Sequence, residues 1–246
     1  MARILTWSQG GAPEGTAVGG NAEPPLPGPL VAACVAVLTR GARGTGRGAR
    51  PGGHVRGAWR APVILVDGRS GSGKSTLASL LARQARTAGV RGLQVARLDS
   101  WYPGWHGLSR GSAITEALLV GGPVPAGETP LRLPGPWIRH AYPAWDWDLD
   151  RVSRGVLLDP HRPLVVEGVG ALTPVSAGAA DLRVWVEVDA GDDPGRAARE
   201  GSIRRTRALA RDGEAYRPWW QTWAGEEDRH LRRLDPSALA DIVVRT

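Results

Sequence analysis

From about residue 61 onward, short apolar runs alternate with longer amphipathic stretches. The first run, residues 63–66, contains no polar position, which is typical of a strand buried on both faces. In residues 75–88 the apolar positions 77, 80, 81 and 85 fall on one helical face, and Gly89 follows directly. The pattern therefore predicts a strand, a Gly-rich turn and a helix in this order.

The alternation continues to the C-terminus. It predicts strands at residues 93–98, 164–166, 182–188 and 241–244, and helices at residues 112–120, 195–211 and about 219–234. Strands that alternate with helices favour a parallel sheet, because each helical connection crosses back over one face of the sheet. We therefore expect residues 61–246 to form an α/β domain: an open parallel sheet of about five strands with helices on both faces.

Residues 1–60 are expected to form a disordered extension. They are rich in Gly, Pro and Arg without a strand or helix period, and only residues 30–38 suit a short helix. This stretch carries seven Arg and two Glu, or +5 of the formal net charge of +7. Because residues 61–246 are nearly balanced, the high pI alone does not indicate nucleic-acid binding. An unstructured leader and an RNA-contacting Arg-Gly segment remain the two interpretations.

The single cysteine, Cys34, excludes an intramolecular disulfide and suits a reducing cytoplasm. The longest apolar run, residues 30–38, is too short to span a bilayer. We therefore expect a cytoplasmic protein with no membrane partner, and the sequence leaves self-association open.

A phosphate-binding P-loop (Walker A) pattern, G-x-x-x-x-G-K-[ST], directly follows the first strand. Lys74 is the only lysine among 31 Lys and Arg residues, and a compact ammonium can reach between two phosphates. Consecutive backbone N–H groups of such a loop wrap phosphates, and Ser75 would place its hydroxyl on Mg²⁺. The residues predicted to bind the ATP phosphates are Gly68, Arg69, Ser70, Gly71, Ser72, Gly73, Lys74, Ser75 and Thr76.

Two acidic residues follow apolar strands, Asp99 after the second strand and Glu167 after the third. In an open parallel sheet, ligands bind outside the carboxyl ends of the strands. One carboxylate can bind Mg²⁺ or its water shell, and the other can accept the proton of an attacking hydroxyl. The alternative for each is a helix cap or a solvated strand end.

Residues 66–76 followed by Asp99-Ser100-Trp101-Tyr102 resemble the uridine kinase branch of P-loop kinases. That family has a P-loop, an Asp-Ser-Phe-Tyr type motif and a Glu-Gly at the third strand, which is matched here by Glu167-Gly168. The resemblance covers about residues 61–246 and implies a P-loop kinase fold that uses ATP and Mg²⁺. It also implies that Asp99 is the catalytic base and that Tyr102 lies at a nucleoside site.

The chain departs from the family at the acceptor site. Trp101 replaces the usual Phe, the Phe-Asp-His-Pro segment is not found, and residues 145–151 lack the histidine of the nucleobase motif. Aromatic rings stack on bases, so tryptophans here are candidates for substrate contact, although they can also replace the absent Phe in a core. The predicted substrate residues are Trp101, Tyr102, Asp146, Trp147 and Arg151.

An Arg-rich stretch at about residues 195–217 ends in Asp212-Gly213 and suits a mobile lid, the position it occupies by resemblance. Arg204, Arg207 and Arg211 are spaced to share one helical face, whereas Arg205 points elsewhere. Cations over the transferred phosphoryl group stabilise its charge, so Arg207 and Arg211 join Lys74 and Asp99 as predicted catalytic residues. A solvated helix face is the alternative.

The expected function is ATP-dependent phosphoryl transfer to a hydroxyl of a small molecule, in first place a nucleoside. A kinase of another small hydroxyl metabolite and a P-loop protein that binds ATP without such transfer remain alternatives. A guanine-specific switch is excluded because its Asn-Lys-x-Asp motif needs a second lysine.

Overall fold

A six-stranded parallel sheet forms the centre of the protein, in the order β1-β8-β7-β2-β6-β3. The computed structural model describes residues 2–8, 25–40, 59–122 and 140–246. The predicted α/β fold with a parallel sheet is confirmed, with one strand more than expected. The strands are β1 (Arg3–Thr6), β2 (Val63–Asp67), β3 (Gln94–Arg97), β6 (Leu164–Glu167), β7 (Leu182–Glu187) and β8 (Ile242–Arg245).

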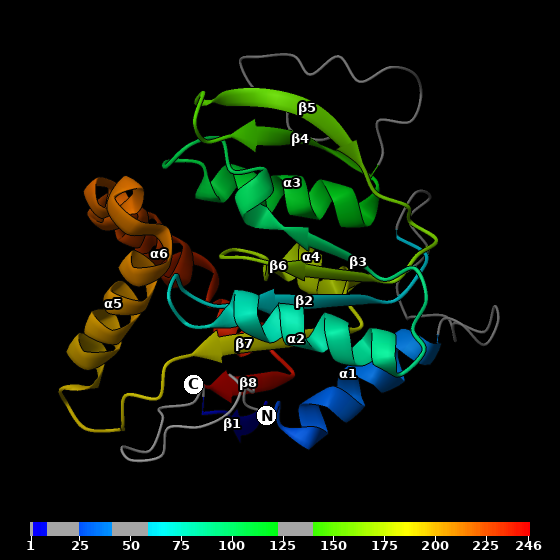
Figure 1. Cartoon of the computed structure of the whole chain (residues 1–246), viewed down its shortest axis with the longest axis horizontal. Helices are drawn as coiled ribbons and strands as arrows, with labels where there is room; N and C mark the ends of the chain where they lie inside the picture. The colour runs from blue at the N-terminus through cyan, green and yellow to red at the C-terminus, as the bar shows by residue number, and fades with distance from the viewer. Residues whose placement is uncertain (1, 9–24, 41–58, 123–139) are drawn as a thin grey trace, which may run out of the picture.

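Helices cover both faces of this sheet (Figure 1). On β2, Ile64 and Val66 pack into a core with α1 and α2, whereas Val63 and Leu65 pack into a second core on the opposite face with α3. This burial on both sides explains why the β2 sequence has no polar position before Asp67. The helices are α1 (Gly28–Arg40), α2 (Lys74–Thr87), α3 (Leu108–Val120), α4 (Pro174–Ala179), α5 (Arg196–Tyr216) and α6 (Trp220–Leu234).

An antiparallel hairpin of β4 (Ala141–Asp146) and β5 (Arg151–Leu157) lies outside the central sheet. Figure 1 shows it above α3, whereas α5 and α6 lie at the left, beside the turn that joins β2 to α2. The sequence pattern did not predict this hairpin, because several of its positions are exposed on both faces and show little alternation.

Two segments assigned to the N-terminal extension belong to the folded domain, which corrects the expectation of disorder for them. β1 pairs in parallel with β8, and Trp7 N donates to Arg245 O at 2.7 Å. The predicted short helix lies within α1, whose buried side chains include Leu30 and Cys34. A four-residue edge strand has too few positions to show a period, so only its pairing reveals it. Residues 9–24 and 41–58, with most of the Arg-Gly run, lie outside the described residues.

Within the described ranges, no helix has both the length and the apolarity that crossing a membrane would require.

Replacing Leu30 with Ala should lower the free energy of unfolding by about 2–5 kcal/mol, because the leucine side chain is fully buried in the core shared by α1 and α2. Urea unfolding followed by tryptophan fluorescence measures the change. Leu149→Ala, at a side chain that is 58% exposed, is the control and should change stability by less than about 0.5 kcal/mol. Equal stability of both variants would show that α1 does not belong to the domain.

Candidate active site

The P-loop joins the end of β2 at Asp67 to the start of α2 at Lys74, so the strand, turn and helix occur as the motif requires. Gly68 and Gly71 have positive φ angles of 152° and 80°. An added Cβ would lie 2.2 Å from Val186 O at Gly68 and 2.1 Å from Arg204 O at Gly71. Only glycine therefore fits these positions, which lets β7 and α5 approach the loop closely.

The hydroxyl of Ser75 lies against the carboxylate of Glu167, as the predicted metal site requires. Ser75 Oγ donates to Glu167 Oε2 at 3.1 Å, and Arg97 Nε lies 3.6 Å from Glu167 Oε1. Burial raises the pKa of Glu167, while the nearby Lys74 lowers it and Asp99 raises it further. The structure thus brings Lys74, Ser75, Glu167 and Asp99 into one neighbourhood.

Glu167 and Ser75 fit a magnesium ion. Glu167 Oε1 is buried and has no hydrogen-bond partner among the described residues, with Arg97 Nε at 3.6 Å as an ion-pair partner, so this oxygen has a lone pair to offer a metal ion. No group of three or more His, Cys, Asp or Glu side chains in the described ranges can hold a metal by itself. Mg²⁺ commonly binds to one or two protein oxygens and takes its other ligands from substrate phosphates and water.

Asp99 lies in a single 3₁₀ turn, Leu98–Ser100, at the end of β3, and its side chain is exposed. Its negative charge acts on Arg211, whose pKa is raised first by the hydrogen bond to Asp212 and further by Asp99 and Glu167. The carboxylate of Asp99 is thus accessible to an incoming hydroxyl group and lies close enough to Arg211 of α5 for their charges to interact.

Asp67 is a site residue that the sequence analysis missed. Its buried carboxylate accepts hydrogen bonds from Gly68 N at 2.6 Å, Gly170 N at 3.0 Å and Leu172 N at 2.8 Å. Burial raises the pKa of Asp67 to about 7, although these bonds and Lys74 act in the opposite direction. Asp67 therefore joins the start of the P-loop to the loop that follows β6. Its position at the end of an otherwise apolar strand was the available signal.

Trp101 and Tyr102 are buried, which corrects their assignment to the substrate. The indole Nε1 of Trp101 donates to Gly111 O at 3.1 Å, and its ring packs 4.5 Å from that of Tyr142. The hydroxyl of Tyr102 donates to Val169 O at 2.6 Å. Both side chains pack in the core between α3 and the sheet, so they support the site from its buried side.

The turn of the β4–β5 hairpin reaches Asp99 through Trp147. Trp147 Nε1 donates to Asp99 O at 2.8 Å, and its ring remains 36% exposed. Asp146 closes the turn instead, because its Oδ1 accepts from Asp148 N and Leu149 N. Arg151 pairs opposite Asp146 in the hairpin register and is exposed. Of these predicted substrate residues, Trp147 is the one that directly contacts Asp99.

A tryptophan outside the predicted set, Trp105, connects the hairpin turn to the end of α5 and the residues that follow it. The ring of Trp105 stacks on Tyr216 at 5.2 Å and on Trp219 at 5.6 Å, and it lies 4.7 Å from the ring of Trp147. The abundance of tryptophan was a signal for such a cluster but did not identify its members. The aromatic cluster (Trp105, Trp147, Tyr216 and Trp219) thus joins the hairpin turn to the end of α5 and the 3₁₀ turn after it.

The arginines predicted to belong to a lid have different environments along α5. Arg204 is buried and Arg205 is exposed, as the helical spacing predicts. Arg207 Nη1 donates to Thr246 Oγ1 at 2.9 Å, and this hydroxyl donates to Ser72 O at 3.0 Å. Arg211 binds Asp212, immediately before a break in the helical backbone at Gly213. Arg207 thus contacts the P-loop through Thr246, while the charge of Arg211 interacts with those of Asp99 and Glu167.

Arg69 and Ser70, predicted to bind phosphates, have their polar groups bound by α6 instead. The buried Glu227 accepts from Ser70 N at 2.7 Å and from Arg69 Nε at 2.9 Å. Trp223 Nε1 donates to Ser70 Oγ at 2.9 Å. These two loop residues therefore attach the P-loop to α6, and residues 71–76 remain the candidates for phosphate contact.

Replacing Asp67 with Asn should lower the free energy of unfolding by about 1–3 kcal/mol, because an amide offers one acceptor oxygen to three backbone N–H donors and directs its NH₂ group at one of them. Urea unfolding at neutral pH measures the loss. Asp148→Asn, at an exposed turn position, is the control and should be nearly neutral. An Asp67→Asn protein as stable as this control would contradict the role of Asp67.

No family model and no curated protein matches the chain. Among solved structures, it is similar to a possible uridine kinase from Bacillus stearothermophilus, with 18% identity and a TM-score of 0.44 over 87% of this chain and 99% of that chain. It is also similar to a fructose transport system kinase candidate from Silicibacter sp. TM1040, with 19% identity and a TM-score of 0.40 over 87% of this chain and 98% of that chain.

Proposed function

We propose that the protein transfers the γ-phosphoryl group of ATP to a hydroxyl group of a small molecule, in first place a nucleoside. The observation that carries this proposal is the placement of an exposed carboxylate, Asp99, beside the P-loop pair of Ser75 and Glu167. A protein that only binds ATP has no need of a second accessible acid at this position.

The P-loop residues bind the triphosphate in this proposal. Backbone N–H groups from Gly71 onward and the N-terminus of α2 surround the phosphate oxygens, and Lys74 neutralises their charge. Ser75 and Glu167 would hold Mg²⁺, which when bound neutralises phosphate charge in the transition state. Asp67 and Glu227 hold the loop in shape from its two sides, so the binding geometry exists before ATP arrives.

Asp99 would act as the base. Its carboxylate accepts the proton of the acceptor hydroxyl as that oxygen attacks the γ-phosphorus, and the bond to the β-phosphate oxygen breaks, which leaves ADP. Arg211, whose charge already interacts with Asp99 and Glu167, would stabilise the negative charge of the transferring group. Arg207 would be linked to the P-loop through its hydrogen bond to Thr246, which donates to Ser72 O.

The exposed ring of Trp147 supports the proposal that the acceptor molecule contains a flat ring. Its indole lies on the backbone of Asp99, so a base stacked on this ring would place an attached sugar near the carboxylate. The same face can pack against the ring of a sugar, which keeps another hydroxyl metabolite as the second candidate. Incubation with ATP, Mg²⁺ and a mixed pool of nucleosides and sugars, followed by mass spectrometry of the products, separates the two. ATP binding without any phosphorylated acceptor would reject both.

Replacing Asp99 with Asn should lower kcat by about 10²–10⁴-fold, because the amide cannot accept the proton, whereas the affinity for ATP should hardly change. Steady-state kinetics with the acceptor that the product analysis identifies, together with calorimetric titration of ATP, measure both quantities. Asp148→Asn in the hairpin turn should leave both unchanged, and Lys74→Ala should abolish transfer. Full activity of Asp99→Asn would refute the assignment of the base.

A further inference from the structure

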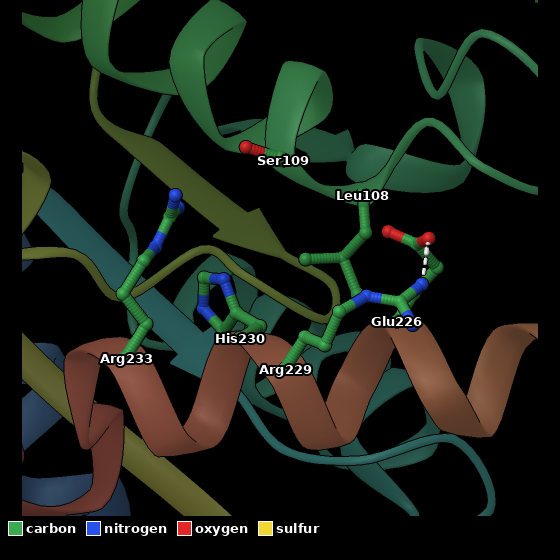
Figure 2. Close-up of a pocket in the computed structure, with 6 residues that line it drawn as sticks. All are labelled: Leu108, Ser109, Glu226, Arg229, His230 and Arg233. Atoms are coloured by element: carbon green, nitrogen blue, oxygen red, sulfur yellow. Dashed lines mark hydrogen bonds and ion pairs between the residues drawn. The ribbon is translucent and has the colours of Figure 1, made fainter.

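A cavity of about 220 Å³ lies between the start of α3 and the middle of α6. Figure 2 shows the six side chains that line it: Leu108, Ser109, Glu226, Arg229, His230 and Arg233. A water molecule takes about 30 Å³ in the liquid, so the space admits a ligand larger than one water. None of these residues belongs to the P-loop or carries a role in the phosphoryl-transfer proposal.

The N-terminus of α3 opens into this cavity. The residue that precedes the helix, Gly107, provides no side-chain cap, and the first turn of this 13-residue helix contains no acidic residue. The first N–H groups of a helix have no partner within it and form the positive end of its dipole. Leu108 and Ser109, which belong to this turn, line the cavity, so the positive end of the helix faces it.

His230 provides an independent observation. Its side chain is only 4% exposed, and neither ring nitrogen has a hydrogen-bond partner in the described part of the chain. Burial, and then the charge of Arg233, lower the pKa of His230 to about 4, so the ring is neutral at pH 7 and carries one N–H donor. Figure 2 shows the ring rising from α6 into the cavity between Arg229 and Arg233. An unpartnered buried donor of this kind is costly and calls for a ligand.

The charges around the cavity leave one cation uncompensated. Arg229 forms an ion pair with Glu226, and His106 Nδ1 lies 3.7 Å from the same carboxylate. For Arg233, no ion pair is found within the described residues. Figure 2 shows its guanidinium directed from α6 toward Ser109. The cavity therefore combines a cation, a neutral imidazole, a hydroxyl and a helix N-terminus.

We propose that this cavity binds a small oxyanion, a phosphate or carboxylate group, with Arg233, His230, Ser109 and the first N–H groups of α3 as donors. Each of these groups donates a hydrogen bond, and oxyanions offer several acceptor oxygens at once. The proposal is independent of the proposed kinase activity, because it involves none of the groups that would bind ATP or the acceptor.

Titration with inorganic phosphate tests this site in the full-length Lys74→Ala protein, where loss of the lysine charge weakens competing phosphate binding at the P-loop. We expect saturable binding by calorimetry, and ¹⁵N NMR of labelled histidine should show one of the five imidazoles changing on titration. A parallel titration with citrate separates phosphate from carboxylate binding. No saturable binding of either anion would overturn the proposal.

Variants in the same background locate the site. Arg233→Ala should weaken phosphate binding by about tenfold or more, since a charge-assisted hydrogen bond is lost. Arg232→Ala, one residue away, exposed and outside the cavity lining, is the matched control and should change the affinity less than about twofold. His230→Gln should remove the NMR response. Because Arg233 is exposed, its replacement tests the site even if the His230 variant fails to fold, and equal affinities of the two arginine variants would refute the location.

Discussion

Glu227 carries a carboxylate with no exposed surface, and this group binds two residues of the P-loop at once, Ser70 through its backbone N–H and Arg69 through its guanidinium. Arg204 of α5 lies 3.4 Å from the same carboxylate and also donates to Ser70 O. A buried charge is stable only when it is paired and hydrogen-bonded, so these groups depend on one another. Their mutual dependence fixes α5 and α6 against the loop, and with them the arginines of α5.

The second buried carboxylate, Asp67, holds the other side of the same loop. It binds Gly68 N at the start of the P-loop and also Gly170 N and Leu172 N after β6. The P-loop is thus attached to the sheet by Asp67 and to α6 by Glu227 at residues 68–70, while residues 71–76, which follow these attachments, remain the candidates for ligand contact. Because both attachments are made by the protein itself, the loop does not need a nucleotide to acquire its shape, which lowers the entropic cost of binding.

Local sequence patterns predicted the parts of this site that lie within one strand, turn and helix. The P-loop, Asp99 and Glu167 were predicted as site residues because each directly follows an apolar strand, and parallel strands bring such ends to one edge. Glu227 was missed because it lies within an amphipathic helix, where an acidic residue is usually solvated, and its partner Ser70 is far away in the sequence. Trp101, in contrast, was wrongly assigned to the substrate. An aromatic residue beside a catalytic motif has the same local pattern whether its ring is exposed or packed in a core.

Lysine and arginine occupy different positions in this site because the space and the acceptors differ at each position. Arg204 uses separate nitrogens of its planar guanidinium to donate to Glu200 Oε1 at 3.1 Å and to Ser70 O at 3.3 Å, a set of acceptors that a single ammonium could not serve in the same directions. Lys74 is buried at the start of α2, where its charge acts on the carboxylates of Asp67 and Glu167. A guanidinium at this position would need a wider space beneath the loop, and its fork would match the oxygens of one phosphate and not the gap between two. A chain that uses arginine at its other basic positions therefore keeps its one lysine where the compact charge is required by the shape of the loop.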